Sequence, residues 1–564
     1  MIRRSGWDTQ CSAAMHTMVV LLLAWGTALP LNAAPPKVNY LFPAGVPRGP
    51  STVVTAAGEF SQWPGQAWSS QSGVQFTPEA EKGKWRVTVA EGVSPGLVFV
   101  RMYDNEGASP LRPFMIGTVP EAEETEPNDS PEKANAGSLP MTWNGKLGKG
   151  GDVDCYAIDL QQGQTLVAAV RANSDFGAPM DAVLQLTEVN SRGDAFVVAQ
   201  ADDSPGLDPR LVYKVTRSGR YVLRVFGFPA ATDSNIGFAG ADTFVYRLTV
   251  TDKAFISHSM PLAVRRGQPC RIEAIGWNLQ DGQRAADVEA VATSTGERLP
   301  IHRAAAASQF PALIVEENSI VVSEEADRVE PPAVMESPVV ISAVIDTPGD
   351  SDRYAFSLKQ SQKIRFRIDA RSIESGLDPH LAVVDSSGKQ LAENDDSGPN
   401  PDSELIFVAP ADGVFHVVVS DAFRHGGPGH YYRLSVLPVA PEFALTLPTD
   451  TVNVAAGKTA EVMVNVERKD GYNLPVEIQV EGLPAGVTVA AVTSMPEGES
   501  AKSVKLIFTA EAATPPSGNT AGRAPIRIVG RDNASPANVR IAMFVVTGTT
   551  HRSGDVWLTV TPAQ

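Results

Sequence analysis

Cysteine is scarce in this chain: 3 of 564 residues, too few for a fold that depends on a disulfide framework. Cys11 lies near the amino terminus, so Cys155 and Cys270 are the two cysteines in the remainder of the chain that could form a disulfide. Strand alternation puts Cys155 on the face opposite to Tyr156 and Cys270 on the inward face with Ile272. We therefore expect two separate thiols. The alternative is a disulfide, which requires Cα atoms within about 7 Å of each other.

Long hydrophobic runs are also lacking. A positive start at Arg3 and Arg4, an apolar run over residues 18–28 and small residues up to Ala33 predict a signal peptide over residues 1–33. No later segment approaches about 18 uninterrupted apolar residues, so we expect no transmembrane anchor in the mature chain. The predicted location is outside the cytoplasm: periplasmic, cell-surface or extracellular.

Basic clusters are absent. The chain carries 47 Lys and Arg against 64 Asp and Glu, for a net charge of −17. Such a field repels nucleic acid, so we expect no nucleic-acid partner. The excess of carboxylates fits divalent cations or basic partners, and equally a solvated acidic surface.

Familiar catalytic motifs are missing too. The sequence contains no His-Glu-x-x-His pair and no Gly-x-Ser-x-Gly elbow, and we expect no enzyme. Paired carboxylates are frequent, so residue types alone do not exclude glycoside hydrolysis. His425 and His430 flank a glycine-rich loop over residues 426–429. This loop is a candidate transition-metal site, and the alternative is a hairpin loop with incidental histidines.

What the chain has in quantity is turn residues, 47 Gly and 43 Pro, between short segments of alternating hydrophobicity. Helical periodicity is nowhere sustained for more than two turns, which predicts an all-β protein. A chain of this length divides into about four to five domains. The predicted fold class is a series of tandem β-sandwiches.

One segment occurs twice. GDVDCYAIDL at residues 151–160 returns as GDSDRYAFSL at residues 349–358, and each copy ends on a similar strand, YRLTV at residues 246–250 and YRLSV at residues 432–436. An acidic turn lies between start and end in both copies, at Asp202 and Asp203 and at Asp395 and Asp396. Asp is common in tight turns, so these pairs are interpreted as turns, with metal ligation as the alternative. A duplicated β unit without catalytic residues indicates binding or spacer modules.

The two copies resemble the bacterial pre-peptidase C-terminal (PPC) domain, a jelly-roll-like sandwich often attached to secreted proteases and collagenases. The matching motifs are ETEPND at residues 124–129, GDVDCY at 151–156, GLDP at 376–379 and ENDD at 393–396. The segments around them resemble immunoglobulin-like (Ig-like) domains, the last through GLPAGV at residues 482–487. These resemblances imply a jelly-roll-like fold for the copies and this domain order: Ig-like at 36–117, PPC-like at 118–252 with an acidic linker, a small Ig-like module at 253–317, PPC-like at 324–437 with a charged connector at 324–332, and Ig-like at 438–564.

A calcium site is the sharpest hypothesis, since Ca²⁺ takes six to eight oxygen ligands. The candidate ligands are Glu124, Glu126, Asn128 and Asp129 in the linker, with Asp152 and Asp154 from the following strand. Collagen-binding relatives of the PPC family bind calcium through a linker of this type, so the resemblance implies the same here. A solvated acidic linker is the alternative. The second copy has only EPP at residues 330–332 in place of the motif.

These features together predict a secreted, non-catalytic protein for adhesion or substrate targeting, with an extracellular protein or polysaccharide as its partner. An accessory of a secreted peptidase or carbohydrate-active system and a structural spacer of the envelope are the alternatives. Trp63, Trp68, Tyr431 and Tyr432 are candidates for an aromatic binding platform, although aromatic residues at strand spacing are usually core.

Overall fold

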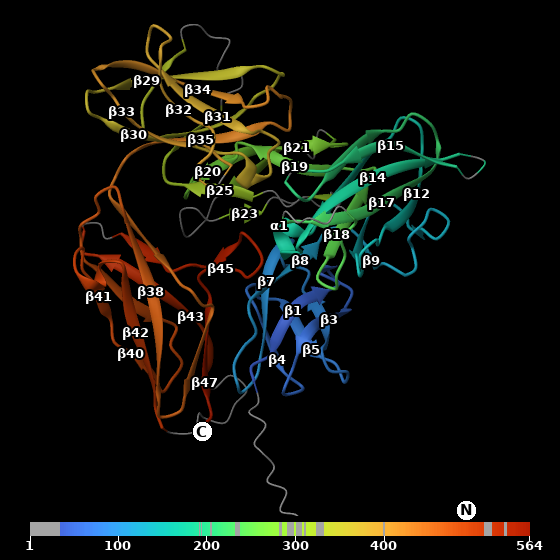
Figure 1. Cartoon of the computed structure of the whole chain (residues 1–564), viewed down its shortest axis with the longest axis horizontal. Coiled ribbons are helices and arrows are strands. Elements are labelled where there is room, and N and C mark those ends of the chain that lie inside the picture. The colour runs from blue at the N-terminus through green and yellow to red at the C-terminus, as the bar shows by residue number, and fades with distance from the viewer. Residues whose placement is uncertain are drawn as a thin grey trace, which may run out of the picture. The chain divides into compact units, whose positions relative to one another are not determined.

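The computed structural model describes residues 34–190, 192, 194–203, 206–231, 237–280, 285–289, 298–300, 307–308, 312–322, 332–398, 401–512, 522–534 and 538–563. The predicted signal peptide (1–33) lies outside these ranges, as do residues 324–331 of the predicted connector. Strands dominate the described chain, and its one α-helix is the single turn α1 (Asn173–Phe176) (Figure 1). The all-β prediction is therefore confirmed.

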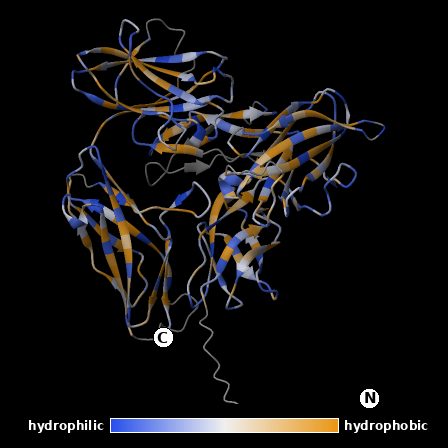
Figure 2. Ribbon diagram, in the orientation of Figure 1, coloured by the Kyte–Doolittle hydropathy of each residue, from blue (hydrophilic) through white to orange (hydrophobic). Residues whose placement is uncertain are grey.

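Hydrophobic and hydrophilic residues alternate along many strands (Figure 2), as expected when one face of a sheet packs on a core. β6 (Lys84–Val89) is a clear case, because Trp85, Val87 and Val89 are buried while the residues between them are exposed. In the described part of the chain no helix has the length and apolarity needed to cross a membrane.

The first pair of sheets is formed by residues 37–117. One sheet has the order β1 (Lys37–Phe42), β3 (Thr52–Glu59), β6, β5 (Val74–Pro78). The other has the order β2 (Gly45–Pro47), β8 (Arg112–Gly117), β7 (Gly96–Tyr103), β4 (Gln66–Ser69). Their shared core includes Val54, Trp85, Val100 and Phe114.

The first repeat supplies the next pair of sheets. One sheet has the order β10 (Asn135–Ala136), β12 (Asp154–Leu160), β17 (Gly219–Pro229), β14 (Met180–Val189), β15 (Ala195–Ala201). The other has the order β16 (Arg210–Lys214), β13 (Thr165–Arg171), β18 (Val245–Thr251), β11 (Met141–Lys146), β9 (Glu121–Glu123). β9 lies inside the predicted acidic linker and pairs with β11 in parallel, so the linker begins as an edge strand of the sandwich.

A smaller pair of sheets follows. One has the order β22 (Ala285–Glu289), β21 (Pro269–Trp277), β19 (Phe255–Met260), β24 (Ala307–Ser308). The other has the order β20 (Ala263–Arg265), β25 (Ala312–Glu316), β23 (Arg298–Pro300).

The second repeat has the same strand order as the first. One sheet runs β27 (Val334–Met335), β29 (Ser351–Leu358), β34 (Gly413–Asp421), β31 (Pro379–Val384), β32 (Gln390–Asn394). The other runs β33 (Glu404–Val408), β30 (Lys363–Asp369), β35 (Tyr431–Pro438), β28 (Val339–Val344), β26 (Ser319–Val322). β26 precedes residue 324, where this module was predicted to begin, and pairs with β28. The boundary is therefore earlier than the sequence suggested, because β26 is the counterpart of β9.

A shared detail supports this correspondence. After β13 and after the equivalent β30, the chain makes one short turn, α1 in the first repeat and η1 (Arg371–Ile373) in the second. Asp208 accepts hydrogen bonds of 2.8–3.1 Å from the N–H groups of residues 172–174. Asp402 accepts bonds of 2.7–3.1 Å from those of residues 370–372. A buried carboxylate thus satisfies the free donors at the start of each turn.

The last pair of sheets is formed by residues 442–561. One has the order β36 (Glu442–Thr446), β38 (Thr459–Lys469), β42 (Ser503–Ala510), β40 (Val487–Val489). The other has the order β37 (Thr451–Ala455), β47 (Val556–Thr561), β43 (Arg523–Asp532), β39 (Val476–Glu481), β41 (Val492–Ser494), with β44 (Val539–Ile541) also on β43. The short strands β45 (Phe544–Val545) and β46 (Arg552–Ser553) pair with each other, and η2 (Glu499–Ala501) precedes β42.

Cys155 and Cys270 are free thiols. Cys155 does lie on the face of β12 opposite to Tyr156, but this face is covered: Cys155 is fully buried in a small cluster with Val183 and Phe226. Cys270 is only half-buried on β21. The expectation of two separate thiols agrees with the structure.

The prediction of an aromatic binding platform is wrong. Tyr431 and Tyr432 are buried and present no surface to a ligand. Trp63 packs edge-on against Trp85 with ring centroids 5.2 Å apart, at the margin of the first core. Trp68 packs near Trp557. These side chains contribute to packing, which is the usual role of aromatic residues at strand spacing.

Candidate functional site

Three carboxylates converge at the entry to the first repeat. Glu124 follows β9, Glu126 lies two residues further on, and Asp154 begins β12. One carboxylate oxygen from each lies within 4.8 Å of the others. Oxygens around a common Ca²⁺ at about 2.3–2.6 Å are separated by up to about 5 Å. The spacing therefore fits ligands of one calcium ion.

The edge strand explains how Glu124 reaches this position. Its backbone N–H donates to the carbonyl of Asn144 on β11 at 3.0 Å. Its carboxylate accepts a 2.7 Å bond from the N–H of Lys146 and a 3.3 Å bond from the Tyr156 hydroxyl. Glu126 is exposed, and its carboxylate accepts the N–H of Asn128 at 2.9 Å. Backbone N–H groups thus orient two of the three carboxylates: that of Lys146 on β11 orients Glu124, and that of Asn128 orients Glu126.

Asp154 is completely buried. Its Oδ2 accepts a 2.5 Å hydrogen bond from the Tyr246 hydroxyl, and Tyr246 lies 2.7 Å from the Tyr156 hydroxyl. Its Oδ1 has no hydrogen-bond partner among the described residues. A buried carboxylate oxygen without a donor is costly unless a proton or a cation lies against it.

The electrostatics of this cluster are those of crowded carboxylates. Burial raises the pKa of Asp154, and the neighbouring carboxylate of Glu124 raises it further. Burial likewise raises the pKa of Glu124 to about 7, with a further increase from Glu126 and an opposing hydrogen bond from the N–H of Lys146. The raised pKa values mean that these buried carboxyl groups retain protons where isolated ones would be ionised, and a divalent cation would replace those protons.

The other three predicted ligands lie next to this cluster but do not join it. Asp152 is buried, with Oδ2 bonded to the N–H of Gly148 at 2.7 Å and Oδ1 without a hydrogen-bond partner among the described residues. Burial raises the pKa of Asp152, and the exposed Asp129 raises it further. Asn128 is buried, and neither side-chain atom has a partner in the described structure. The structure therefore brings three of the six candidates together and leaves three as neighbours.

The two acidic pairs, Asp202 with Asp203 and Asp395 with Asp396, have local features of tight turns. Asp203 has a positive φ of 27°, a conformation that Asp tolerates in tight turns. In the second repeat Asp396 donates its N–H to the Asp395 carboxylate at 3.0 Å, and the Asn394 amide donates to the Asp396 carbonyl at 3.0 Å. These local bonds account for the residue types.

Sequence reasoning missed a buried pair of tyrosines in each repeat. Tyr354 and Tyr432 in the second repeat have hydroxyls 2.7 Å apart, and Tyr432 donates to Asp352 at 2.5 Å. This arrangement matches that of Tyr156 and Tyr246 with Asp154. The signal was present in the duplicated GDxDxY and YRL motifs, which place these side chains on facing strands.

The fold is a chain of successive β-sandwiches, and the first repeat carries a cluster of three carboxylates at its entry. Residues 350–421 match the family described as the bacterial pre-peptidase C-terminal domain. The second repeat thus contains one such domain.

Among known proteins, a probable subtilase-type serine protease of Deinococcus radiodurans is 37% identical over 81 residues. That stretch is 14% of this chain and 11% of the protease, so this chain corresponds to a small part of that relative.

Two solved structures show weaker likenesses. The pre-peptidase C-terminal domain of a collagenase from Bacillus anthracis shares 16% identity, over 21% of this chain and 95% of that domain, with a TM-score of 0.15. PliG, a periplasmic inhibitor of g-type lysozyme from Aeromonas hydrophila, shares 14% identity, over 24% of this chain and 96% of its own, also with a TM-score of 0.15. At these TM-scores neither likeness bears on function.

Proposed function

We propose that this chain is an exported, non-catalytic binding protein whose first repeat is a second PPC domain stabilised by Ca²⁺. Its role is adhesion or substrate targeting toward an extracellular protein or polysaccharide, with Ig-like sandwiches as the remaining modules. The match at residues 350–421 supports export, because domains of this family accompany secreted peptidases. The identical strand order and the repeated Asp-Tyr-Tyr arrangement support a second PPC domain at residues 121–251.

The observation that carries the calcium proposal is the convergence of Glu124, Glu126 and Asp154. Oδ1 of Asp154 and Oδ1 of Asp152 are buried there without a hydrogen-bond donor from the described part of the chain. An all-oxygen set with three carboxylates suits a hard cation such as Ca²⁺. Bound calcium would fix the segment after β9 against the start of β12. It would thereby make the entry to the first repeat rigid.

The test is calcium titration of the whole purified chain after treatment with EGTA, followed by calorimetry. We expect one saturable event and a higher melting temperature, both lost in the double variant Glu124→Gln/Glu126→Gln. Glu132→Gln removes one exposed carboxylate from the same segment and should bind like the parent. No heat and no change in melting temperature for the parent chain would refute the calcium site.

The binding role is tested separately. Immobilised gelatin, collagen and polysaccharides should retain the chain if it targets substrates, and none should retain it if it is only a spacer. Casein and glycan panels should show no turnover.

A second candidate is an accessory or component of a secreted peptidase system, favoured by the 81-residue likeness to the Deinococcus protease. In that case the chain would change the activity of a peptidase toward an insoluble substrate without cleaving it alone.

A further inference from the structure

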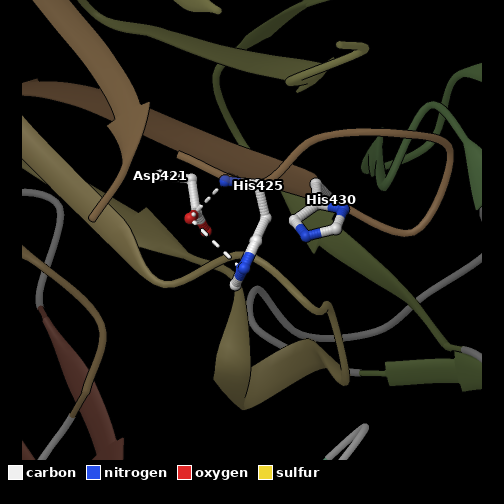
Figure 3. A group of neighbouring side chains, drawn as sticks. All are labelled: Asp421, His425 and His430. Carbon is white, nitrogen blue, oxygen red and sulfur yellow. Dashed lines mark hydrogen bonds and ion pairs between the residues drawn. The ribbon is translucent and has the colours of Figure 1, made fainter. Parts of the chain in front are cut away.

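A second cluster of ligand-type side chains lies in the other repeat. Asp421 is the last residue of β34, His425 lies in the loop that follows, and His430 directly precedes β35. One ligand atom from each residue lies within 4.8 Å of the others. Figure 3 shows the two imidazole rings and the carboxylate gathered at one end of the loop.

Asp421 is held in place by the backbone. Its side chain is buried, and its Oδ2 accepts the N–H of Asp378 at 2.9 Å. Its Oδ1 accepts the N–H groups of Phe423 and His425 at 2.9 and 2.8 Å. A carboxylate offers about four acceptor positions, so three donors leave capacity for a metal. The donors fix the orientation, as outer-shell partners do for metal ligands.

His430 places a second imidazole beside the Asp421 carboxylate. Its Nδ1 is buried and has no hydrogen-bond partner among the described residues. Burial lowers the pKa of His430, and the neighbouring His425 lowers it further, against an opposing effect of Asp421. The neutral imidazole is the form that binds metal.

The loop follows a fixed path that brings the histidines together. A Cβ on Gly426 would lie 2.2 Å from the carbonyl oxygen of Thr347, so only glycine allows this close approach. Gly427 donates its N–H to the Ile345 carbonyl at 2.8 Å and accepts the N–H of His430 at 2.9 Å. His425 itself is exposed, which gives an ion access from solvent.

The first repeat shows that the fold does not require these residues. Ala182 pairs with Gly227 as Pro379 pairs with Asp421, so Gly227 occupies the position of Asp421. Phe244 precedes β18 as His430 precedes β35. Neither Gly227 nor Phe244 can bind a metal, and the same sandwich forms around them.

We propose that Asp421, His425 and His430 bind one divalent transition-metal ion, with Zn²⁺ as the representative. Two imidazoles and a carboxylate are ligands that Zn²⁺ prefers, at about 2.0–2.2 Å, whereas Ca²⁺ favours oxygen alone. Zn²⁺ usually takes four ligands, so three protein ligands leave a fourth position open for water or for a group of a bound molecule. The site is independent of the proposed calcium site, which lies in the other repeat and has no histidine.

The experiment is titration of the metal-free whole chain with Zn²⁺, using protein prepared without a histidine tag. We expect one high-affinity equivalent by calorimetry. His425→Ala and His430→Ala should each weaken it at least tenfold. Co²⁺ provides a second readout, because a site with nitrogen and oxygen ligands gives a visible absorption spectrum that both variants should lose.

Two controls make the outcome specific. His416→Ala removes a histidine from β34 outside the cluster, and Glu124→Gln/Glu126→Gln removes the calcium candidates. Both should bind Zn²⁺ like the parent chain. Because His425 is exposed, its variant should fold normally, which the metal-free melting temperature checks. Absence of a saturable Zn²⁺ event would overturn the proposal, as would parental affinity in both histidine variants.

Discussion

The hydroxyl groups of Tyr354 and Tyr432 lie 2.7 Å apart between the two sheets of the second repeat, and Tyr432 also donates to the buried carboxylate of Asp352 at 2.5 Å. Tyr354 comes from β29 and Tyr432 from β35, so the bond joins facing sheets. A polar group between sheets must be satisfied to be tolerated. The first repeat contains the same arrangement, which makes it a structural signature of this duplicated unit.

Tyr432→Phe should destabilise the second repeat by about 1–3 kcal/mol, because the Asp352 carboxylate would lose its short donor while it stays buried. Urea unfolding read by a short hydrogen-exchange pulse would assign the loss to peptides from β29 and β35. Tyr213→Phe is the control, since among the described residues its hydroxyl makes one long hydrogen bond, at 3.3 Å to Thr216 near the surface, and it should change stability by less than about 0.5 kcal/mol. Equal effects of the two variants would contradict the assigned role.

Asp154→Asn should separate a structural role of this carboxylate from a metal-binding one. Without calcium, the amide keeps an acceptor for Tyr246 and gains a donor toward Glu124, so the melting temperature should hold or rise. With calcium at 100 times the Kd, the parent chain should gain about 2.7 kcal/mol, and the variant should gain much less.

The duplication offers the matched control for this experiment. Asp352→Asn makes the same change at the equivalent position of the second repeat, and it should leave the calcium response intact. A full calcium response in Asp154→Asn would exclude Asp154 as a ligand. Loss of the response in Asp352→Asn would place the ion elsewhere.

The sequence predicted the β architecture well because the pattern that indicates a strand lies within a few consecutive residues. Alternation along β6 and the turn residues between strands indicate sheets without knowledge of the partners. The duplicated motifs also predicted that two segments share a structure, and the identical strand orders agree with this. β26 was missed because a four-residue edge strand has little periodicity of its own, and its pairing with β28 depends on the whole sheet.

Prediction of the site was less complete, for a physical reason. The spacing of Glu124, Glu126 and Asn128 along the chain does not reveal which side chains point the same way. The hydrogen bond from the Glu124 N–H to the Asn144 carbonyl fixes Glu124 near Asp154, whereas Asn128 is buried. Cys155 illustrates the same limit: its face was correctly predicted, but the cover that buries it comes from distant segments.

Cys155 and Cys270 should differ sharply in reactivity. Cys155 has no exposed surface, whereas Cys270 is half-buried, and alkylating reagents need access to the sulfur. In the native chain, iodoacetamide should label Cys270 and leave Cys155 unmodified, with both labelled after denaturation. Peptide mass spectrometry distinguishes the two sites. Rapid native labelling of Cys155 would mean that the cluster with Val183 and Phe226 opens readily.

His258 should make the stability of the small sandwich depend on pH. It is buried on β19, its Nδ1 lies 2.9 Å from the Ser257 hydroxyl and its ring stacks on Tyr431. Burial and, to a smaller extent, the positive charge of Arg210 lower the pKa of His258 to about 3. In the unfolded chain the pKa is about 6.5.

Between these two pKa values the unfolded chain binds a proton that the folded chain does not, so acid favours unfolding. The contribution of His258 is fully present above about pH 6.5 and is lost as the pH falls toward 3, by about 2 kcal/mol between pH 7 and pH 5. His258→Phe keeps the ring stacking but cannot titrate, so its loss of stability over this interval should be smaller by that amount. Urea unfolding at each pH, followed by a labelling pulse at one fixed pH, reports the difference in peptides from β19 and β21. Because other groups titrate equally in both proteins, an unchanged slope in His258→Phe would show that His258 is protonated or solvated in the folded chain.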